Sequence, residues 1–120
     1  MKDSGQALIS LIMISGISLI ILTGAILVAV IAAQSSLTTR QSTQSRVSAE
    51  SGIENAAIRL LRNPAYAGEI LNIDSNTVTI NIAANKIDSQ GKVGSVIKRI
   101  ESDFQLNNSI LRILSWKDRP

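Results

Sequence analysis

The chain contains no cysteine and no histidine, and its 120 residues include one tryptophan, one tyrosine and one phenylalanine. Without cysteine, no disulfide framework can hold a small domain together. The absence of histidine and cysteine also removes side chains used most often in acid–base catalysis and in transition-metal sites. We find no glycine-rich phosphate loop, no paired-carboxylate motif and no Ser-x-x-Lys arrangement in a suitable context. The sequence therefore predicts a protein that is not an enzyme and uses no cofactor.

The carboxylates do not form a recognisable metal-binding motif. The aspartates beyond the N-terminal third are far apart in sequence, and no EF-hand-like spacing links them. They are Asp74, Asp88, Asp103 and Asp118. We therefore expect no metal site.

The charged residues give a formal net charge of +3, with Lys and Arg scattered from Arg40 to Arg119 among acidic residues. A nucleic-acid surface needs a clustered basic stripe or stacking aromatic side chains. The aromatic residues are only Tyr66, Phe104 and Trp116. The pattern indicates a solvated surface and argues against nucleic acid as a partner.

One long uncharged segment dominates the first third of the chain. No charged residue occurs from Ala7 to Ala33, and Leu, Ile, Val and Ala fill most of these positions. As a helix the segment would be roughly 40 Å long, whereas the hydrocarbon core of a bilayer is about 30 Å thick. We expect a single membrane-spanning helix in contact with the lipid bilayer, either tilted or protruding at one end.

Composition and length leave three interpretations of this N-terminal region open. A cleaved secretory signal has a shorter apolar region, although residues 30–33 form a weak small-x-small cleavage site. A plain signal anchor inserts because of its apolar length alone, whatever sequence follows it. The third interpretation, a short leader followed by a long helix, depends on the residues before the apolar segment.

The first twelve residues read Met-Lys-Asp-Ser-Gly-Gln-Ala-Leu-Ile-Ser-Leu-Ile, so that a short charged leader ends in Gly5 just before the apolar segment. This start resembles the type IV prepilin-like family, which includes minor pilins and pseudopilins. The resemblance implies that prepilin peptidase cuts between Gly5 and Gln6, with residues 1–5 as the leader. It also implies a cytoplasmic N-terminus, an extracytoplasmic C-terminal domain and, after assembly, a place in a cell-surface filament.

Two positions depart from the pattern of the major pilins in this family. Major pilins begin the mature chain with Phe and have Glu at its fifth position, where this chain has Gln6 and Ser10. In the family, that carboxylate is thought to neutralise a neighbour's N-terminal amine within the apolar filament core, where an unpaired charge is costly. Because Ser10 has no charge, the resemblance implies a minor pilin or pseudopilin, located at the filament tip or scattered along it.

The helix is expected to continue beyond the membrane segment, over residues 34–63. Residues 34–48 are rich in Ser, Thr and Gln, and by themselves they look like a linker. From residue 49 onward, apolar side chains recur at helical spacing, which predicts a face that packs against the rest of the domain. Pro64 ends the helix because it has no amide hydrogen to donate. The residues assigned to packing against the sheet are Ile53, Ala56, Ala57, Leu60 and Leu61.

Two patterns of small residues lie on this helix. Residues 49–56 look like the Ala-Glu-x-Gly-x-x-x-Ala block common in minor pilins, and close packing at Gly52 would offset its cost of about 1 kcal/mol relative to Ala. In the membrane segment, small residues on one face allow helix backbones to approach each other, in a filament or in a dimer of anchors. The residues assigned to this packing are Ser18, Ala25, Ala29 and Ala33.

Beyond residue 64 the periodicity changes from helix to strand. Apolar and polar side chains alternate over residues 77–84, which predicts a half-buried strand. Turn-forming clusters at residues 74–76, 88–91 and 107–108 divide the region into an antiparallel meander.

Two later segments are harder to assign. Residues 93–104 fit helix and strand spacing alike, and the flanking turns favour a strand. The nearly continuous apolar run at residues 110–116 predicts a buried strand, either central in the sheet or covered by the helix at residues 53–61. Trp116 is expected in the core.

The predicted fold is α+β, with a single long N-terminal helix packed against a small antiparallel β-meander over residues 64–120. Residues 6–33 form the transmembrane and assembly part of the helix, and residues 34–63 continue it. The resemblance predicts a non-enzymatic subunit of a type IV pilus-like or type II secretion-like filament. Its partners would be other pilin subunits and an inner-membrane assembly platform. The alternative is a membrane-anchored extracytoplasmic binding module that does not enter a filament.

Overall fold

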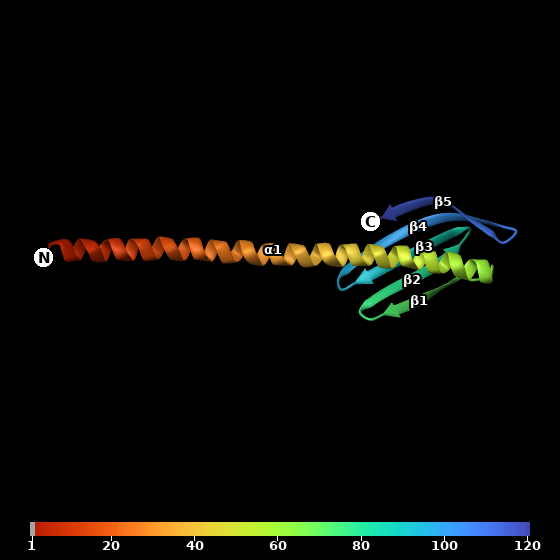
Figure 1. The fold of residues 1–120 in the computed structure, drawn as a ribbon, viewed down its shortest axis with the longest axis horizontal. Helices are drawn as coiled ribbons and strands as arrows, with labels where there is room; N and C mark the ends of the chain where they lie inside the picture. Colours follow the sequence, from red (N-terminus) through yellow and green to blue (C-terminus); the bar gives the residue numbers. More distant parts are fainter. Residues whose placement is uncertain (1) are drawn as a thin grey trace. The chain divides into compact units, whose positions relative to one another are not determined.

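The computed structural model describes residues 2–120, with side chains from residue 3 onward, and Figure 1 shows its ribbon. One helix, α1, runs from Lys2 to Arg62 and is followed by five strands. The chain divides into two compact units, Met1–Leu37 and Thr38–Pro120, and α1 contributes to both. The expected α+β fold class is confirmed, while Met1 of the expected leader lies outside the described residues.

The polar stretch at residues 34–48 is helical, although its composition is typical of a linker. Two of its hydroxyl groups bond to the helix backbone. Thr43 Oγ1 donates to the Thr39 carbonyl oxygen at 3.1 Å, and Ser45 Oγ donates to the Ser42 carbonyl oxygen at 3.0 Å. Ser45 is fully buried in the second unit, so tertiary packing stabilises this part of the helix. Packing overrides the weak helical propensity of Ser and Thr here.

The C-terminus of α1 is closed by local hydrogen bonds. The Asn63 amide donates to the Arg59 carbonyl oxygen at 2.8 Å, and Asn63 Oδ1 accepts a bond from the Ala65 amide at 3.1 Å. Pro64 then prevents further helix. The helix therefore ends within one residue of the predicted position.

The five strands form one antiparallel sheet in which each strand pairs with its neighbours in sequence, in the order β1-β2-β3-β4-β5. Two-residue turns join them, and the turn residues 84–85 and 108–109 all have positive φ, as type I′ hairpin turns require. The strands are β1 (Gly68–Ile73), β2 (Asn76–Ala83), β3 (Lys86–Val93), β4 (Val96–Asn107) and β5 (Ile110–Arg119).

The core lies between the sheet and the part of α1 that belongs to the second unit, which crosses one face of the sheet in Figure 1. Alternate residues of the central strands point towards the helix, as the period of two in a strand requires. The buried apolar residues of this core are Ala49, Ile53, Ala56, Leu60, Val78, Ile80, Ile87, Ile100 and Phe104.

The predicted turn at residues 88–91 is wrong, because these residues form the middle of β3. The chain instead reverses at Ala84 and Asn85. The turn-like composition has a packing reason: Ser89 and Gly91 face α1, where larger side chains would not fit. The strand assigned to residues 93–104 is confirmed from Val96 onward, and Val93 ends β3.

The prediction that residues 110–116 form a central or covered strand is also wrong. β5 is an edge strand, and it pairs only with β4. Ile110, Leu114 and Trp116 are 63%, 63% and 43% exposed, so Trp116 is not a core residue. The β4–β5 register shifts between Asp103 and Phe104, which leaves Leu114 of β5 unpaired in a β-bulge. The side chains of β5 therefore do not alternate regularly between the two faces of the sheet at Leu114.

Candidate functional site

The N-terminal segment of α1 presents an apolar surface along its whole length. The large apolar side chains from Leu8 to Ile31 are between 48% and 74% exposed. The helix is long and apolar enough to cross a bilayer, and none of its most apolar stretch is buried within the protein. Such a surface is unfavourable in water and is suited to lipid or to other apolar helices.

Two hydroxyl groups in this segment bond to the backbone of the helix itself. Ser10 Oγ donates to the Gln6 carbonyl oxygen at 3.0 Å, and Thr23 Oγ1 donates to that of Leu19 at 2.8 Å. In a bilayer core an unpaired hydroxyl would be costly, so these bonds lower the cost of placing Ser10 and Thr23 in an apolar environment. Ser10 has no formal charge to offer a neighbouring chain.

The predicted processing and packing positions are all helical and exposed. Gly5 and Gln6 lie in the first turns of α1, and apart from the adjoining helix backbone no atom lies within 4 Å of where a Cβ on Gly5 would be. The small residues assigned to helix packing are likewise uncovered in the single chain; they are Ser18, Ala25, Ala29 and Ala33. Their roles in processing and assembly stay predictions.

The residues predicted to pack against the sheet divide into two groups. Ile53, Ala56 and Leu60 belong to the buried core, with exposed fractions of 0 to 1%, and Ala57 is half-buried beside them. Leu61 is 47% exposed and does not belong to the core. It follows Leu60 by about 100° around the helix, which turns its side chain away from the sheet.

α1 and β3 approach each other closely because both carry small residues at the contact. A Cβ on Gly91 would lie 2.8 Å from the Ala49 amide nitrogen and closer still to the Ser45 carbonyl oxygen. A Cβ on Gly52 would lie 2.7 Å from Cγ1 of Val78. The Gly52 position in the small-residue block is therefore used for helix–sheet packing within the chain.

Sequence reasoning did not identify the buried serine residues of the domain. Ser45, Ser89 and Ser102 are fully buried, and Ser89 Oγ has no hydrogen-bond partner among the described residues. Ser45 and Gly52 are seven positions apart on α1, with Ala49 between them on the same face. This spacing of small residues was the signal available in the sequence.

A polar cluster fastens the end of α1 to β1. Glu69 Oε1 accepts a hydrogen bond from the Tyr66 hydroxyl at 2.9 Å and forms an ion pair with Arg59 Nε at 2.7 Å. The Arg59 guanidinium also lies 5.7 Å from the centre of the Tyr66 ring, within cation–π distance. Burial, followed by the hydrogen bond to Glu69, raises the pKa of Tyr66 to about 12.

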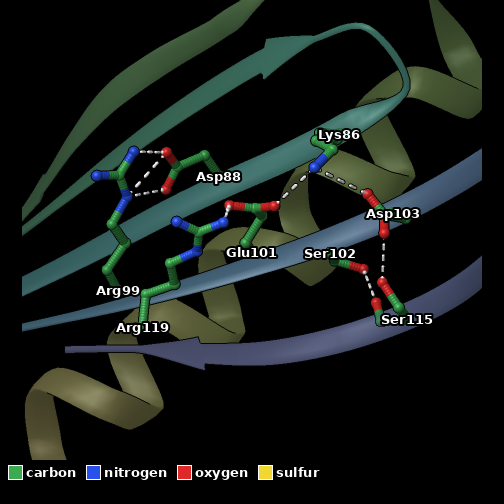
Figure 2. A network of polar contacts seen from close by, with 8 residues as sticks. All are labelled: Lys86, Asp88, Arg99, Glu101, Ser102, Asp103, Ser115 and Arg119. Carbon is green, nitrogen blue, oxygen red and sulfur yellow. Dashed lines mark hydrogen bonds and ion pairs between the residues drawn. The ribbon is translucent and has the colours of Figure 1, made fainter.

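An ion-pair network crosses β3, β4 and β5 on the sheet (Figure 2). Glu101 pairs with Lys86 at 2.9 Å and with Arg119 at 3.1 Å, and Arg99 binds Asp88. The hydrogen bond from Lys86 holds the pKa of Glu101 below its usual value. These contacts join strands that are neighbours in the sheet, which is typical of cross-strand stabilisation.

The same network reaches β5 through two serines (Figure 2). Ser115 Oγ donates to Asp103 Oδ2 at 2.6 Å, and Ser102 Oγ donates to the Ser115 carbonyl oxygen at 2.9 Å. The hydrogen bond from Ser115 holds the pKa of Asp103 below its usual value. The carboxylates of Figure 2 are thus engaged by cations or hydroxyls within the sheet.

No family model, no curated protein and no solved structure matches this chain. Within residues 2–120, no group of three or more His, Cys, Asp or Glu side chains is placed to hold a metal ion. The features that bear on function are the exposed apolar segment of α1 and the surfaces of the sheet.

Proposed function

We propose that this protein is a non-enzymatic subunit of a type IV pilus-like or type II secretion-like filament, with the role of a minor pilin or pseudopilin. The observation that carries the proposal is a single helix, Lys2 to Arg62, with two different surfaces. Its N-terminal segment exposes its apolar side chains, whereas residues 45–60 are built into the sheet. A filament subunit needs both: an apolar helix that leaves lipid for other helices, and a folded domain attached to it.

The position of Gly5 supports processing by a prepilin peptidase. Gly5 and Gln6 immediately precede the apolar segment, and the space around Gly5 is open. Cleavage there leaves a mature chain that begins with apolar helix, the form that a filament core accepts. The leader, residues 1–5, is removed at the membrane before assembly.

Cleavage is tested by mass spectrometry of the N-terminus of the protein from its native cells. We expect a mature chain that begins at Gln6. Gly5→Leu should accumulate as an uncleaved membrane precursor, and Gly16→Leu, a matched change within the same helix, should be processed normally because Gly16 also faces open space. Mature protein starting at Gln34, or wild type retaining Met1, would contradict the proposal.

Ser10 bears on the number of copies in a filament. Its hydroxyl is already bonded to the Gln6 carbonyl oxygen, and it cannot neutralise a neighbour's N-terminal amine. An uncompensated ammonium buried in an apolar core costs several kcal/mol, and a bulk subunit would meet that cost at every position. We expect copy numbers far below those of the main subunit by quantitative mass spectrometry of sheared filaments, and higher incorporation for Ser10→Glu. Finding this protein as the dominant subunit would rule out a minor role.

The proposed topology places the sheet domain outside the cytoplasm. The chain has no native cysteine, so single-cysteine labelling has no background. Ser75 lies exposed in the turn between β1 and β2. Ser75→Cys should react with a membrane-impermeant maleimide in intact spheroplasts. Labelling only after the membrane is permeabilised would place the domain in the cytoplasm.

The alternative, a membrane-anchored binding module, is favoured by the edge strand β5. Apolar side chains that a solitary domain would be expected to bury are exposed there, including Ile110 and Leu114. A binding module would keep its N-terminal residues and would stay in the membrane fraction when filaments are sheared from cells. Co-purification of cleaved protein with sheared filaments separates the two functions.

A further inference from the structure

The positive charge of the chain gathers at one end of the sheet domain. Lys2 and Asp3 cancel, so the formal charge of +3 belongs to the residues after them, and Arg40 is the first charged residue beyond the apolar segment. The sequence distributes the later cations widely. We define the basic end as Arg40, Arg46, Lys92, Lys98 and Arg119.

Contacts within the second unit bring the segments that carry these residues to the same end of the domain. The turn between β3 and β4 lies against α1, since a Cβ on Gly94 would be 2.8 Å from Nε2 of Gln41. Lys92 and Lys98 flank that turn on the two strands, and Arg40 precedes Gln41 on the helix. Figure 1 shows the β3–β4 turn and the C-terminus at the same end of the sheet.

An open hollow of about 500 Å³ forms part of the basic end. Arg46, Lys98 and Arg119 line it, together with one carboxylate, Asp118, and the hydroxyl-bearing residues of the adjacent helix turn. Arg46 pairs with Asp118 at 3.2 Å. The hollow therefore combines cations and hydrogen-bond donors, which is the chemistry that recognises phosphate.

Three cations at the basic end are not neutralised by the protein. Arg40, Lys92 and Lys98 are exposed and form no ion pair with any residue that the structure describes, whereas Arg46 and Arg119 pair with carboxylates. Asp74, in the neighbouring β1–β2 turn, is the opposing carboxylate at this end, also without an ion pair among the described residues. Among side chains, unpaired positive charge exceeds unpaired negative charge there by three to one.

The membrane is the nearest large anionic surface that the sequence provides. Arg40 follows the last residue of the apolar segment by seven positions, roughly 10 Å of helix. The headgroup region adds about 5–7 Å on each side of the hydrocarbon core. Tilting is one way in which a bilayer accommodates an apolar helix longer than its core, and it lowers the residues that follow the helix towards the headgroups.

We propose that the basic end is a docking surface for the phosphates of anionic phospholipids, in the leaflet from which α1 emerges. Lys92 and Lys98 bind headgroups on either side of the β3–β4 turn, and Arg40 binds them beside the helix. The proposal requires only that the apolar segment lies in a bilayer. It does not depend on filament assembly or on cleavage after Gly5, so either proposal can fail without the other.

The test uses the full-length chain with a spin label on Ser95→Cys, in the exposed β3–β4 turn, reconstituted in vesicles. In phosphatidylcholine the label should collide freely with a water-soluble relaxation agent. Adding phosphatidylglycerol should reduce the collisions, and high salt should restore them because the Debye length falls from about 10 Å at 0.1 M to about 3 Å at 1 M. Soluble glycerol phosphate at matched ionic strength should leave the protection by phosphatidylglycerol unchanged.

A pair of matched variants removes equal charge from opposite ends of the domain. Each basic residue near an anionic surface contributes roughly fivefold, so Lys92→Gln/Lys98→Gln should lower the preference for phosphatidylglycerol about 30-fold and abolish protection. Arg62→Gln/Arg112→Gln, at the end of α1 and on β5, should retain it. The proposal is overturned if wild type shows no protection, if both variants lose it equally, if the lysine variant keeps it, or if glycerol phosphate removes it.

Discussion

Gly91 offers the sharpest test of how α1 and the sheet fit together. In Gly91→Ala the new methyl group meets backbone atoms of the helix, 2.8 Å from the Ala49 amide nitrogen and nearer to the Ser45 carbonyl oxygen. Neither atom can rotate away, because both belong to consecutive turns of a regular helix. The methyl group is accommodated only if α1 and β3 move apart.

The expected cost follows from two opposing effects. Replacing Gly by Ala restricts the unfolded chain, which stabilises a protein by about 0.4–1 kcal/mol where the native backbone tolerates it. Inserting a methylene into a packed core costs about 1–3 kcal/mol, and more when backbone must shift. We expect a net loss of about 2 kcal/mol, equivalent to roughly 8–16 °C in the melting temperature of a domain of this size.

The assay is thermal unfolding of the full chain in detergent, followed by the fluorescence of Trp116, the one tryptophan. Gly24→Ala is the matched control, since a Cβ at Gly24 has no atom within 4 Å apart from the adjoining helix backbone. Gly52→Ala should lie between the two, because it meets side chains of Ser89 and Val78 that can adjust. A Gly91→Ala protein that melts with wild type, or no lower than Gly52→Ala, would refute the reasoning.

Three further predictions concern the same domain. Ser89→Ala should raise the free energy of unfolding by about 1 kcal/mol in urea titrations, because it removes a buried hydroxyl with no partner among the described residues; a loss would show that the hydroxyl is bonded. Leu60→Ala should cost about 2–5 kcal/mol and Leu61→Ala less than about 0.5, and equal costs would contradict the burial. Because folding raises the pKa of Tyr66 from 10.0 to about 12, its contribution is complete below pH 10 and is lost as the pH rises towards 12. Tyr66→Phe should flatten that alkaline decline in unfolding experiments, and an unchanged decline would assign it to other groups.

The helix and the fold class were predictable because their signals are local and long. An uncharged run without proline, followed by apolar residues at helical spacing and then Pro64, determines α1 to within a residue at its C-terminus. The alternation around Val78 and Ile80 likewise identified β2. Both patterns arise from a local need to place apolar side chains away from water, so they are visible in the order of residues within a single segment.

The errors came from residues whose role depends on a partner distant in sequence. Ser89 and Gly91 have turn-like composition, but they are in β3 because α1 approaches too closely for larger side chains. Gly52 lies against Ser89, and Ser45 and Ala49 lie against Gly91. Trp116 and its apolar neighbours suggested a core strand, yet β5 ends the sheet. Neither close approach nor edge position leaves a periodic signal in a single strand.

The basic end likewise depends on residues that are distant in sequence. Lys92 and Lys98 are separated from Arg40 by about half of the chain, and in sequence only Lys98 has a basic neighbour, Arg99. The β3–β4 turn, which lies against Gln41, brings the strand ends that carry them to the end of the domain where Arg40 lies. A clustered basic surface was therefore absent from the sequence and present in the folded domain.

The strictly sequential order of the five strands has a consequence for how the chain acquires its structure during synthesis. Every strand after β1 pairs with the one made just before it, across a two-residue turn, so each pairing has low contact order and forms as a hairpin within about 1–10 μs. α1 is synthesised first, and each new strand then finds a finished edge beside a helix that is already present. A chain interrupted after β4 would still have four paired strands on the helix, and translation of the last ten-residue strand completes the sheet without rearranging any earlier pairing.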